Sequence, residues 1–271
     1  MHLAQISAAV SRAAGERGGV RPSPNIWHTP DVYELENQAF DRADQVGAAI
    51  DALHPLAGAT LLDIGCGTGY HLPGFADRGA RVLGLEPHPP LARLAAARLA
   101  DRPESSARQG PSSAPEPAPR PPAPSPDVAR RAGVLTGEAE HLPLANATVD
   151  VAVARWAYFF GPGCEPGLAE VERVLRPGGL AAFLDNDATR SRFGGWFAAS
   201  LPAYDPIAVR RFWRRQGFTA LDLDLAWECP DRATFEAIVR IEFAPALADR
   251  ILATHPGTSV DYAVTLWHRT H

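Results

Sequence analysis

The chain has 271 residues, a formal net charge of −5 at pH 7 and 46% hydrophobic residues. This length accommodates one large α/β domain with additions, well above the size at which a hydrophobic core becomes marginal. The acidic balance, without a basic cluster that includes stacking aromatic residues, argues against nucleic acid or an anionic membrane surface as a partner. We expect a monomer or homodimer that acts on a small molecule.

Three cysteines, Cys66, Cys164 and Cys229, occur without a C-x-x-C pair, so the sequence predicts neither a disulfide framework nor a metal site. The chain contains no lysine, which excludes lysine Schiff-base chemistry. The sequence lacks both the signature of a signal peptide and an apolar run long enough to cross a membrane. We therefore expect a cytoplasmic, reduced protein.

Residues 1–54 are predicted to form an N-terminal arm followed by a helical segment. Thr29 as N-cap, with Pro30 and Asp31 in the first turn, indicates the start of one helix. A second helix is predicted over Arg42 to Leu53.

Next comes an apolar run, Leu61 to Ile64, that leads into Gly65, Gly67 and Gly69. This pattern predicts a buried strand, a tight turn and the start of a helix, and glycines let a ligand approach the backbone closely. Tyr70 stands where the dinucleotide fingerprint requires its third glycine, which disfavours an NAD-dependent oxidoreductase. The absence of lysine excludes a Walker phosphate loop. A turn that binds no ligand is the remaining alternative.

A second buried strand, Arg81 to Glu86, ends in a carboxylate about 20 residues after the first glycine. At this offset an acidic side chain accepts hydrogen bonds from ribose hydroxyls. The alternative for Glu86 is a helix N-cap or a solvated charge. A helix over Pro89 to Ala100 follows, with its apolar residues on one face. Residues 101–133 are rich in proline and are predicted to be a disordered insert, far from the ligand edge of the sheet.

The remainder of the chain contains further predicted elements in a regular order. These are strands at Val134–Thr136 and Val149–Arg155, a helix, turn and strand over Leu168–Leu184, a helix over Asp205–Gln216, a strand over Phe218–Trp227, helices over Asp231–Phe243 and Pro245–Ala253, and a strand over Val260–Trp267. Residues 228–256 are thus a helical insert before the last strand.

The ordered segments from Leu61 to Leu184 resemble the motif set of the class I S-adenosylmethionine (SAM)-dependent methyltransferases. Within that class they are most similar to small-molecule enzymes of the ubiquinone/menaquinone methyltransferase type. The resemblance implies an α/β fold: a seven-stranded Rossmann-like sheet with helices on both faces and an N-terminal helical lid. The methyltransferase domain would cover residues 55–271. Trp27 and Tyr33 are candidates for the lid, or simply packing aromatics.

The resemblance also implies SAM as cofactor and assigns contacts to it. The methionyl and ribose parts of the cofactor would face Asp63 and the glycine turn. Glu86 would bind the ribose hydroxyls, and Glu138 with the Ala139 N–H would bind the adenine. Arg155 would lie against the cofactor through its backbone. The cofactor-binding set is therefore Asp63, Gly65, Cys66, Gly67, Gly69, Glu86, Glu138, Ala139 and Arg155.

No catalytic residue follows from the motifs, because methyl transfer from a sulfonium needs mainly positioning and desolvation. Candidates for a general base are His71, Tyr158, His141 and His28, each of which could equally be a surface or packing residue. A SAM-binding protein that transfers no methyl group is an open alternative, since the motifs report binding alone.

The fourth strand lacks the N/D-P-P-Y turn of enzymes that methylate nucleobase amines, which disfavours such a substrate. An apolar or aromatic small molecule is favoured instead by a group of aromatic residues after the fourth and fifth strands. These are Trp156, Tyr158, Phe159, Phe160, Phe193, Trp196 and Phe197.

Overall fold

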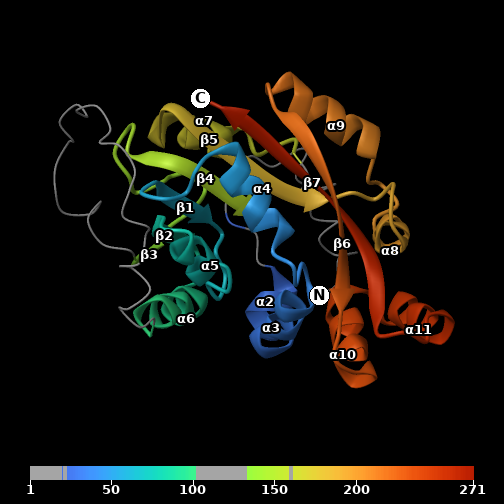
Figure 1. Cartoon of the computed structure of the whole chain (residues 1–271). Helices are drawn as coiled ribbons and strands as arrows, with labels where there is room; N and C mark the ends of the chain where they lie inside the picture. The colour runs from blue at the N-terminus through green and yellow to red at the C-terminus, as the bar shows by residue number, and fades with distance from the viewer. Residues whose placement is uncertain (1–19, 21–22, 102–132, 159–160) are drawn as a thin grey trace.

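The computed structural model describes residues 20, 23–101, 133–158 and 161–271. Most of the predicted N-terminal arm and proline-rich insert, together with Phe159 and Phe160, lie outside the described residues. A seven-stranded sheet with the order β3-β2-β1-β4-β5-β7-β6 runs through the molecule (Figure 1). Its strands are β1 (Thr60–Ile64), β2 (Arg81–Glu86), β3 (Gly133–Thr136), β4 (Val149–Arg155), β5 (Leu175–Asn186), β6 (Thr219–Glu228) and β7 (Ser259–Thr270).

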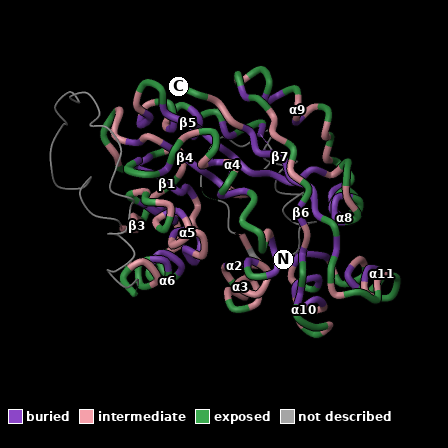
Figure 2. The backbone as a smooth tube through the Cα atoms, viewed as in Figure 1, coloured by how far each residue is buried: buried purple, intermediate pink, exposed green. Residues whose placement is uncertain are grey.

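Strands β1 to β5 pair in parallel, whereas β7 runs antiparallel to both β5 and β6. All five residues of β1 are buried, because a central parallel strand is covered on both faces (Figure 2). The edge strand β6 is instead exposed at several positions. The predicted seven-stranded α/β sheet is confirmed, and its carboxyl edge collects the ends of β1, β2 and β4.

Helices cover both faces of this sheet, as predicted. They include α5 (Leu72–Asp77) and α6 (Pro89–Ala100) before β3, α7 (Glu165–Val174) before β5, and α9 (Pro206–Arg215) before β6. Arg155 of β4 lies over the Phe75 ring of α5, and Trp213 of α9 stacks on Trp267 of β7. Arg155 is in register with Leu184, and Leu184 with Leu266, the neighbour of Trp267. Because adjacent residues of a strand face opposite ways, α5 and α9 lie on opposite faces.

The N-terminal region forms three helices, α2 (Pro24–His28), α3 (Pro30–Ala39) and α4 (Gln45–Leu53). The sequence did not predict α2, and it placed the start of α4 three residues too early, at Arg42. Asp41 and Asp44 have positive φ angles of 48° and 51°, so the chain turns there. The Asp41 carboxylate accepts hydrogen bonds from Gln45 N and from the next amide, both at 2.8 Å, and thereby caps the helix later than predicted.

Three more helices flank the last two strands. The sequence did not predict α8 (Arg192–Ser200), because its interior contains Gly194 and Gly195. The Ser191 hydroxyl caps it by accepting a hydrogen bond from Gly194 N at 2.9 Å. The predicted helices α10 (Arg232–Glu242) and α11 (Pro245–Thr254) lie between β6 and β7, and α10 packs against α3 (Figure 1).

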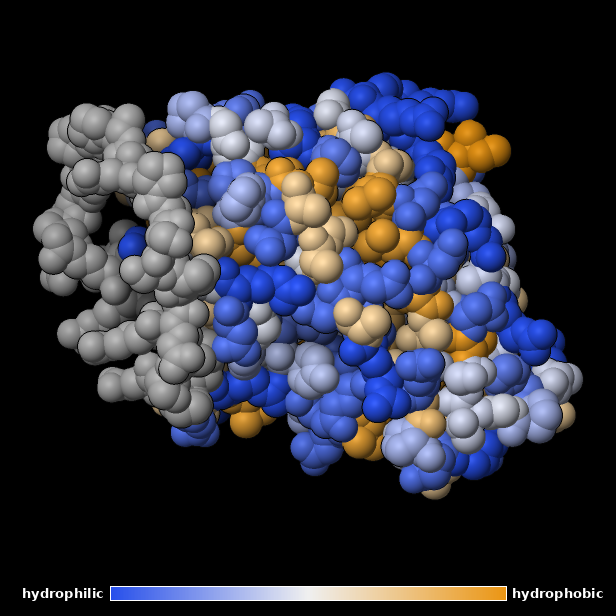
Figure 3. All heavy atoms as spheres, viewed as in Figure 1, coloured by the Kyte–Doolittle hydropathy of each residue, from blue (hydrophilic) through white to orange (hydrophobic). Residues whose placement is uncertain are grey.

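The face of the molecule seen in Figure 3 mixes hydrophilic and hydrophobic atoms. Among the described residues the large exposed hydrophobic side chains are Val20, Leu53, Leu94 and Ile207. The last three belong to the separate helices α4, α6 and α9, and Val20 precedes the first helix. Within the described ranges, none of the helices combines the length and apolar character needed to span a bilayer.

Candidate active site

Three glycines shape the turn that leaves β1. Gly65, Gly67 and Gly69 have φ angles of 71°, 57° and 74°, which L side chains rarely adopt. A Cβ atom on Gly65 would lie 2.9 Å from the Ala157 side chain, and one on Gly69 would lie 2.7 Å from the Ala95 side chain. The turn is also tied to β2, since the N–H groups of Gly65 and the following residue both donate to the Leu85 carbonyl. The hydrogen bonds therefore fix the backbone of the turn, and a side chain at any of the three glycines would be strained.

The carboxylate of Glu86, at the end of β2, points at this turn. Its Oε2 accepts a hydrogen bond from Gly67 N at 2.9 Å, and its Oε1 accepts one from His88 N at 2.9 Å. Only 4% of Glu86 is exposed. Burial raises the pKa of this carboxyl, and the two N–H donors oppose that rise by stabilising the charged form.

Asp63, Arg155 and His71 form a polar group beneath the turn. Asp63 is buried, and desolvation, opposed by the positive charge of Arg155, raises its pKa to about 7. Arg155 Nη1 lies 3.1 Å from His71 Nδ1. A guanidinium can only donate, so Nδ1 must be the unprotonated nitrogen of a neutral imidazole. Burial and the Arg155 charge also lower the pKa of His71 well below its usual value, in agreement with that tautomer.

Helices α2 and α3 cover the glycine turn. The Cδ1 atom of Ile26 lies 2.6 Å from the position that a Cβ on Gly67 would take. The Trp27 and His88 rings stack with their centroids 4.2 Å apart. Glu34 accepts a hydrogen bond from the Thr68 hydroxyl at 3.0 Å and forms an ion pair with Arg98 at 2.5 Å.

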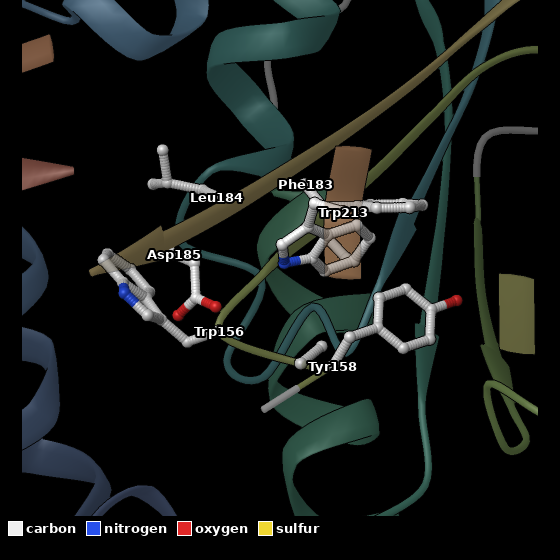
Figure 4. Close-up of a pocket in the computed structure, with 8 residues that line it drawn as sticks. Trp156, Tyr158, Phe183, Leu184, Asp185 and Trp213 are labelled. Carbon is white, nitrogen blue, oxygen red and sulfur yellow. The ribbon is translucent and has the colours of Figure 1, made fainter. Parts of the chain in front are cut away.

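A small pocket lies beside the turn at the carboxyl ends of β4 and β5 (Figure 4). Trp156, Tyr158, Phe183 and Trp213 supply its aromatic walls, and the Asp185 side chain projects among them. Ala157 also lines this pocket, and its side chain is the one that a Cβ atom on Gly65 would meet. Trp156 has a positive φ of 50°, which is uncommon for a bulky residue, and its indole N–H donates to Asn186 Oδ1 at 2.8 Å.

A family model described as "Methyltransferase domain" matches residues 62–183. The malonyl-[acyl-carrier protein] O-methyltransferase of Serratia marcescens is 29% identical over 178 residues, 66% of this chain and 51% of that protein. An uncharacterized methyltransferase of Mycobacteroides abscessus is 33% identical over 140 residues, 52% of this chain and 44% of that protein. The chain thus spans about half the length of the curated relatives it matches.

Two solved structures share the fold. The YcgJ protein from Bacillus subtilis superposes with a TM-score of 0.53 at 15% identity, covering 83% of this chain and 97% of that one. Geranyl diphosphate C-methyltransferase from Streptomyces coelicolor gives a TM-score of 0.52 at 15% identity, covering 94% of this chain and 89% of that one.

Residues 62–183 thus match a methyltransferase domain, within a chain that has the Rossmann-like class I methyltransferase fold.

The predicted cofactor residues divide between two places. The glycine turn, Asp63, Glu86 and the Arg155 side chain lie together at the carboxyl edge of the sheet. The backbone of Arg155 pairs with Leu184 of β5, and its guanidinium contacts His71 and the Phe75 ring. The predicted backbone contact of Arg155 with the cofactor remains a prediction. Burial raises the pKa of the Cys66 thiol far above its usual value, which makes it a poor nucleophile.

The predicted adenine segment lies after β3, next to the end of β2. Gly137 N approaches the Glu86 carbonyl at 3.4 Å, and Glu138 forms an isolated bridge with His141. Glu138 is exposed and Ala139 is half-buried. Their contacts with adenine remain a prediction.

The four candidate bases are in different surroundings. His28 and His141 are exposed, and the Nδ1 lone pair of His71 is directed at Arg155. The Tyr158 phenol is buried against Gly167 of α7, and burial raises its pKa far above the usual value. A role as general base for any of the four remains a prediction.

The aromatic group predicted to contact an acceptor also divides. Trp156 and Tyr158 line the pocket, whereas Phe193 and Phe197 are 1% and 0% exposed and belong to the hydrophobic core. Phe193 stacks on Tyr262 of β7 with centroids 3.8 Å apart. These two side chains therefore serve packing, because α8 turns its apolar face onto β7.

Sequence reasoning missed Glu34, His88, Glu36 and Glu242 as residues near the site. One signal was available for Glu242. The buried face of α10 consists of Phe235, Ile238, Val239 and Glu242, so a carboxylate occupies a position where the helical period requires an apolar residue.

Proposed function

We propose that this methyltransferase binds SAM across the carboxyl ends of β1, β2 and β4 and transfers its methyl group in line to a small apolar or aromatic acceptor. The observation that carries the proposal is the hydrogen bond between Glu86 and Gly67 N. It directs a buried carboxylate to a turn whose three glycines have positive φ angles and whose backbone lies open to close approach. Bare backbone beside a fixed acceptor suits a ligand with ribose hydroxyls.

The residues present fit this cofactor. Glu86 would accept hydrogen bonds from the ribose, and Glu138 with Ala139 N would meet the adenine edge. Arg155 Nε is buried without a hydrogen-bond partner, so it offers a donor for the carboxylate of the methionyl part. Asp63 supplies the complementary negative charge. When bound, the cofactor supplies an activated methyl group on a sulfonium.

The protein contributes orientation and the exclusion of water. Helices α2 and α3 already contact the turn through Ile26, Trp27 and Glu34, so a ligand there would be enclosed. Holding two reactants in line in such a site lowers a barrier by about 7–11 kcal/mol. Neutral His71 holds the Arg155 guanidinium in place through Nδ1.

The nature of the acceptor is inferred from the pocket beside the turn. Trp156, Phe183 and Trp213 offer apolar rings, and the Trp213 indole N–H is buried without a hydrogen-bond partner. A molecule with an aromatic or aliphatic body and one accepting oxygen would match these groups.

Isothermal titration calorimetry with S-adenosylhomocysteine tests the cofactor half of the proposal. We expect saturable heat with one site per chain, and no heat with NADH. Release of S-adenosylhomocysteine from SAM across a panel of small acceptors tests the transfer half. A folded sample that gives no heat would refute the proposal. Product formation without turnover of bound SAM would instead identify a protein that uses the cofactor without methyl transfer.

A further inference from the structure

Two polar side chains converge inside the pocket at the carboxyl ends of β4 and β5. Phe183 and Asp185 lie on the same face of β5, because alternate residues of a strand share a face, and the Trp213 ring of α9 packs against Phe183 with centroids 5.7 Å apart. Asp185 is 5% exposed and Trp213 is 1% exposed. Both line the pocket, and Figure 4 shows the Asp185 carboxylate and the Trp213 indole nitrogen directed into the same space.

The Trp213 indole N–H finds no hydrogen-bond partner within the described part of the chain. A buried donor without an acceptor is costly, so it indicates a place for one. The Asp185 carboxylate accepts a hydrogen bond from Asn186 N at 3.0 Å, and a carboxylate has lone pairs for several donors. The Tyr158 hydroxyl is not part of this group, because Figure 4 shows it pointing away from Asp185.

The size and the opening of the pocket limit what can occupy it. The space inside accommodates a group about as large as one water molecule. Trp156 and Ala157 are the half-buried residues of its lining, so the pocket opens beside them. The Ala157 side chain also meets the position of a Cβ atom on Gly65, which places this opening next to the glycine turn. One small polar group of a ligand can therefore enter, while the rest of the ligand stays beside the turn.

We propose that Asp185 and Trp213 form the subsite that recognises the methyl acceptor by one of its hydroxyl groups. This rests on the function proposed above and names the class of acceptor. A hydroxyl donates its O–H to the Asp185 carboxylate and accepts the Trp213 N–H through the same oxygen atom. A carbonyl group only accepts and an ammonium group only donates, so each leaves one of the two side chains unpaired. The subsite therefore selects an alcohol or a phenol and anchors it beside the glycine turn.

The test uses two alcohols, each with a carbonyl compound and an ammonium ion of the same carbon skeleton. Cyclohexanol is matched with cyclohexanone and cyclohexylammonium, and benzyl alcohol with benzaldehyde and benzylammonium. Calorimetry on the full chain, with and without S-adenosylhomocysteine, measures the dissociation constants. We expect at least one alcohol to bind about tenfold more tightly than both of its matched compounds. The Trp213 indole N–H signal in a proton–nitrogen correlation NMR spectrum should shift with that alcohol and not with its ammonium ion.

Substitutions separate the two halves of the subsite. Asp185→Asn replaces the carboxylate by an amide that can also donate, so the alcohol should lose its advantage over the carbonyl compound. Trp213→Phe removes the N–H donor, so the alcohol should lose its advantage over the ammonium ion. Trp227→Phe is the matched control, because the Trp227 indole N–H is also buried without a partner among the described residues, and this residue does not line the pocket. This control should keep both preferences.

The proposal is overturned if no alcohol is preferred, which is the result expected if the space holds only a water molecule. It is also overturned if either variant keeps the preference that it should lose, or if Trp227→Phe loses the same preferences. Where a variant does not fold, the Trp213 N–H signal of the unmodified protein decides, and no shift with alcohol refutes the subsite. Failure to bind S-adenosylhomocysteine would refute the proposed function instead, and the alcohol preference measured without that ligand would still decide the role of Asp185 and Trp213.

Discussion

The glycine turn and the Glu36–Glu242 pair are both buried polar features at the carboxyl edge of the sheet, yet they form in different ways. The turn is made from consecutive residues after β1 and one carboxylate from the next strand. The pair is made from α3, near the beginning of the chain, and α10, near its end. The first is fixed by local backbone geometry, whereas the second exists only when two distant helices pack.

This difference separates what each region can do. The turn presents rigid backbone and a carboxylate that two N–H donors hold in place, which suits one unvarying cofactor. The pair instead places two coupled carboxyl groups between packed helices, where burial raises the pKa of both. Substitutions in the two regions should therefore affect different measurements.

The largest effect is expected for Glu86→Ala. Removing this carboxylate deletes the acceptor for Gly67 N and the proposed ribose contacts, and hydrogen bonds to charged groups contribute about 1.5–3 kcal/mol each. The dissociation constant of S-adenosylhomocysteine should rise about 100-fold or more in calorimetry. Glu172→Gln, on the exposed side of α7, is the control. Unchanged affinity in Glu86→Ala would show that the ligand does not use this edge.

Glu34→Ala should have the next largest effect. It removes the hydrogen bond from Thr68 and the ion pair with Arg98 that join α3 to the turn. With the cover loosened, we expect S-adenosylhomocysteine to dissociate about tenfold faster in stopped-flow measurements. A dissociation rate equal to that of the unmodified protein would mean that α3 does not enclose the ligand.

The carboxyl pair predicts a dependence of stability on pH. Burial raises the pKa values of Glu36 and Glu242. Between the unfolded pKa, near 4.3, and the raised folded pKa, the folded state holds protons that the unfolded chain has released. This contribution to stability is complete below the unfolded pKa and is lost as pH rises through the folded pKa.

Glu242→Gln should therefore gain stability relative to the unmodified protein as pH rises from 5.5 to 8, by roughly 1–3 kcal/mol, because its amide needs no proton. Urea unfolding at several pH values measures this, with Glu236→Gln as control. A pH-independent difference between the two proteins would contradict the raised pKa values of the two glutamates.

His71→Asn should have a small effect. The amide oxygen of Asn can accept the hydrogen bond from Arg155 that His71 Nδ1 now accepts. Because His71 is held neutral and uses its lone pair there, we expect S-adenosylhomocysteine affinity within about threefold of the original value. A large loss of turnover with unchanged S-adenosylhomocysteine affinity would indicate that His71 acts as a base.

Deleting residues 103–127 should have the smallest effect. The flanking elements are α6, which ends at Ala100, and β3, which begins at Gly133, at the end of the sheet opposite the glycine turn. Cofactor affinity should be unchanged in a folded deletion variant. Loss of affinity would mean that the insert reaches the carboxyl edge.

The sequence by itself determined the sheet, the glycine turn and the acidic residue on β2. These features depend on alternation, apolar runs and glycine spacing, all of which act over a few neighbouring residues. The sequence did not predict where α4 begins, nor that α8 forms. In both places a capping side chain, Asp41 or Ser191, outweighs the helix propensity of the neighbouring residues.

Only the tertiary structure decided which side chains meet across the sheet edge. It directs the Arg155 side chain at His71, moves Phe193 and Phe197 into the core, and joins Glu36 to Glu242. Each of these contacts depends on the packing of elements far apart in the chain, and burial then changes the charge state of the groups involved. A sequence pattern contains the residues but not the burial that gives them their chemistry.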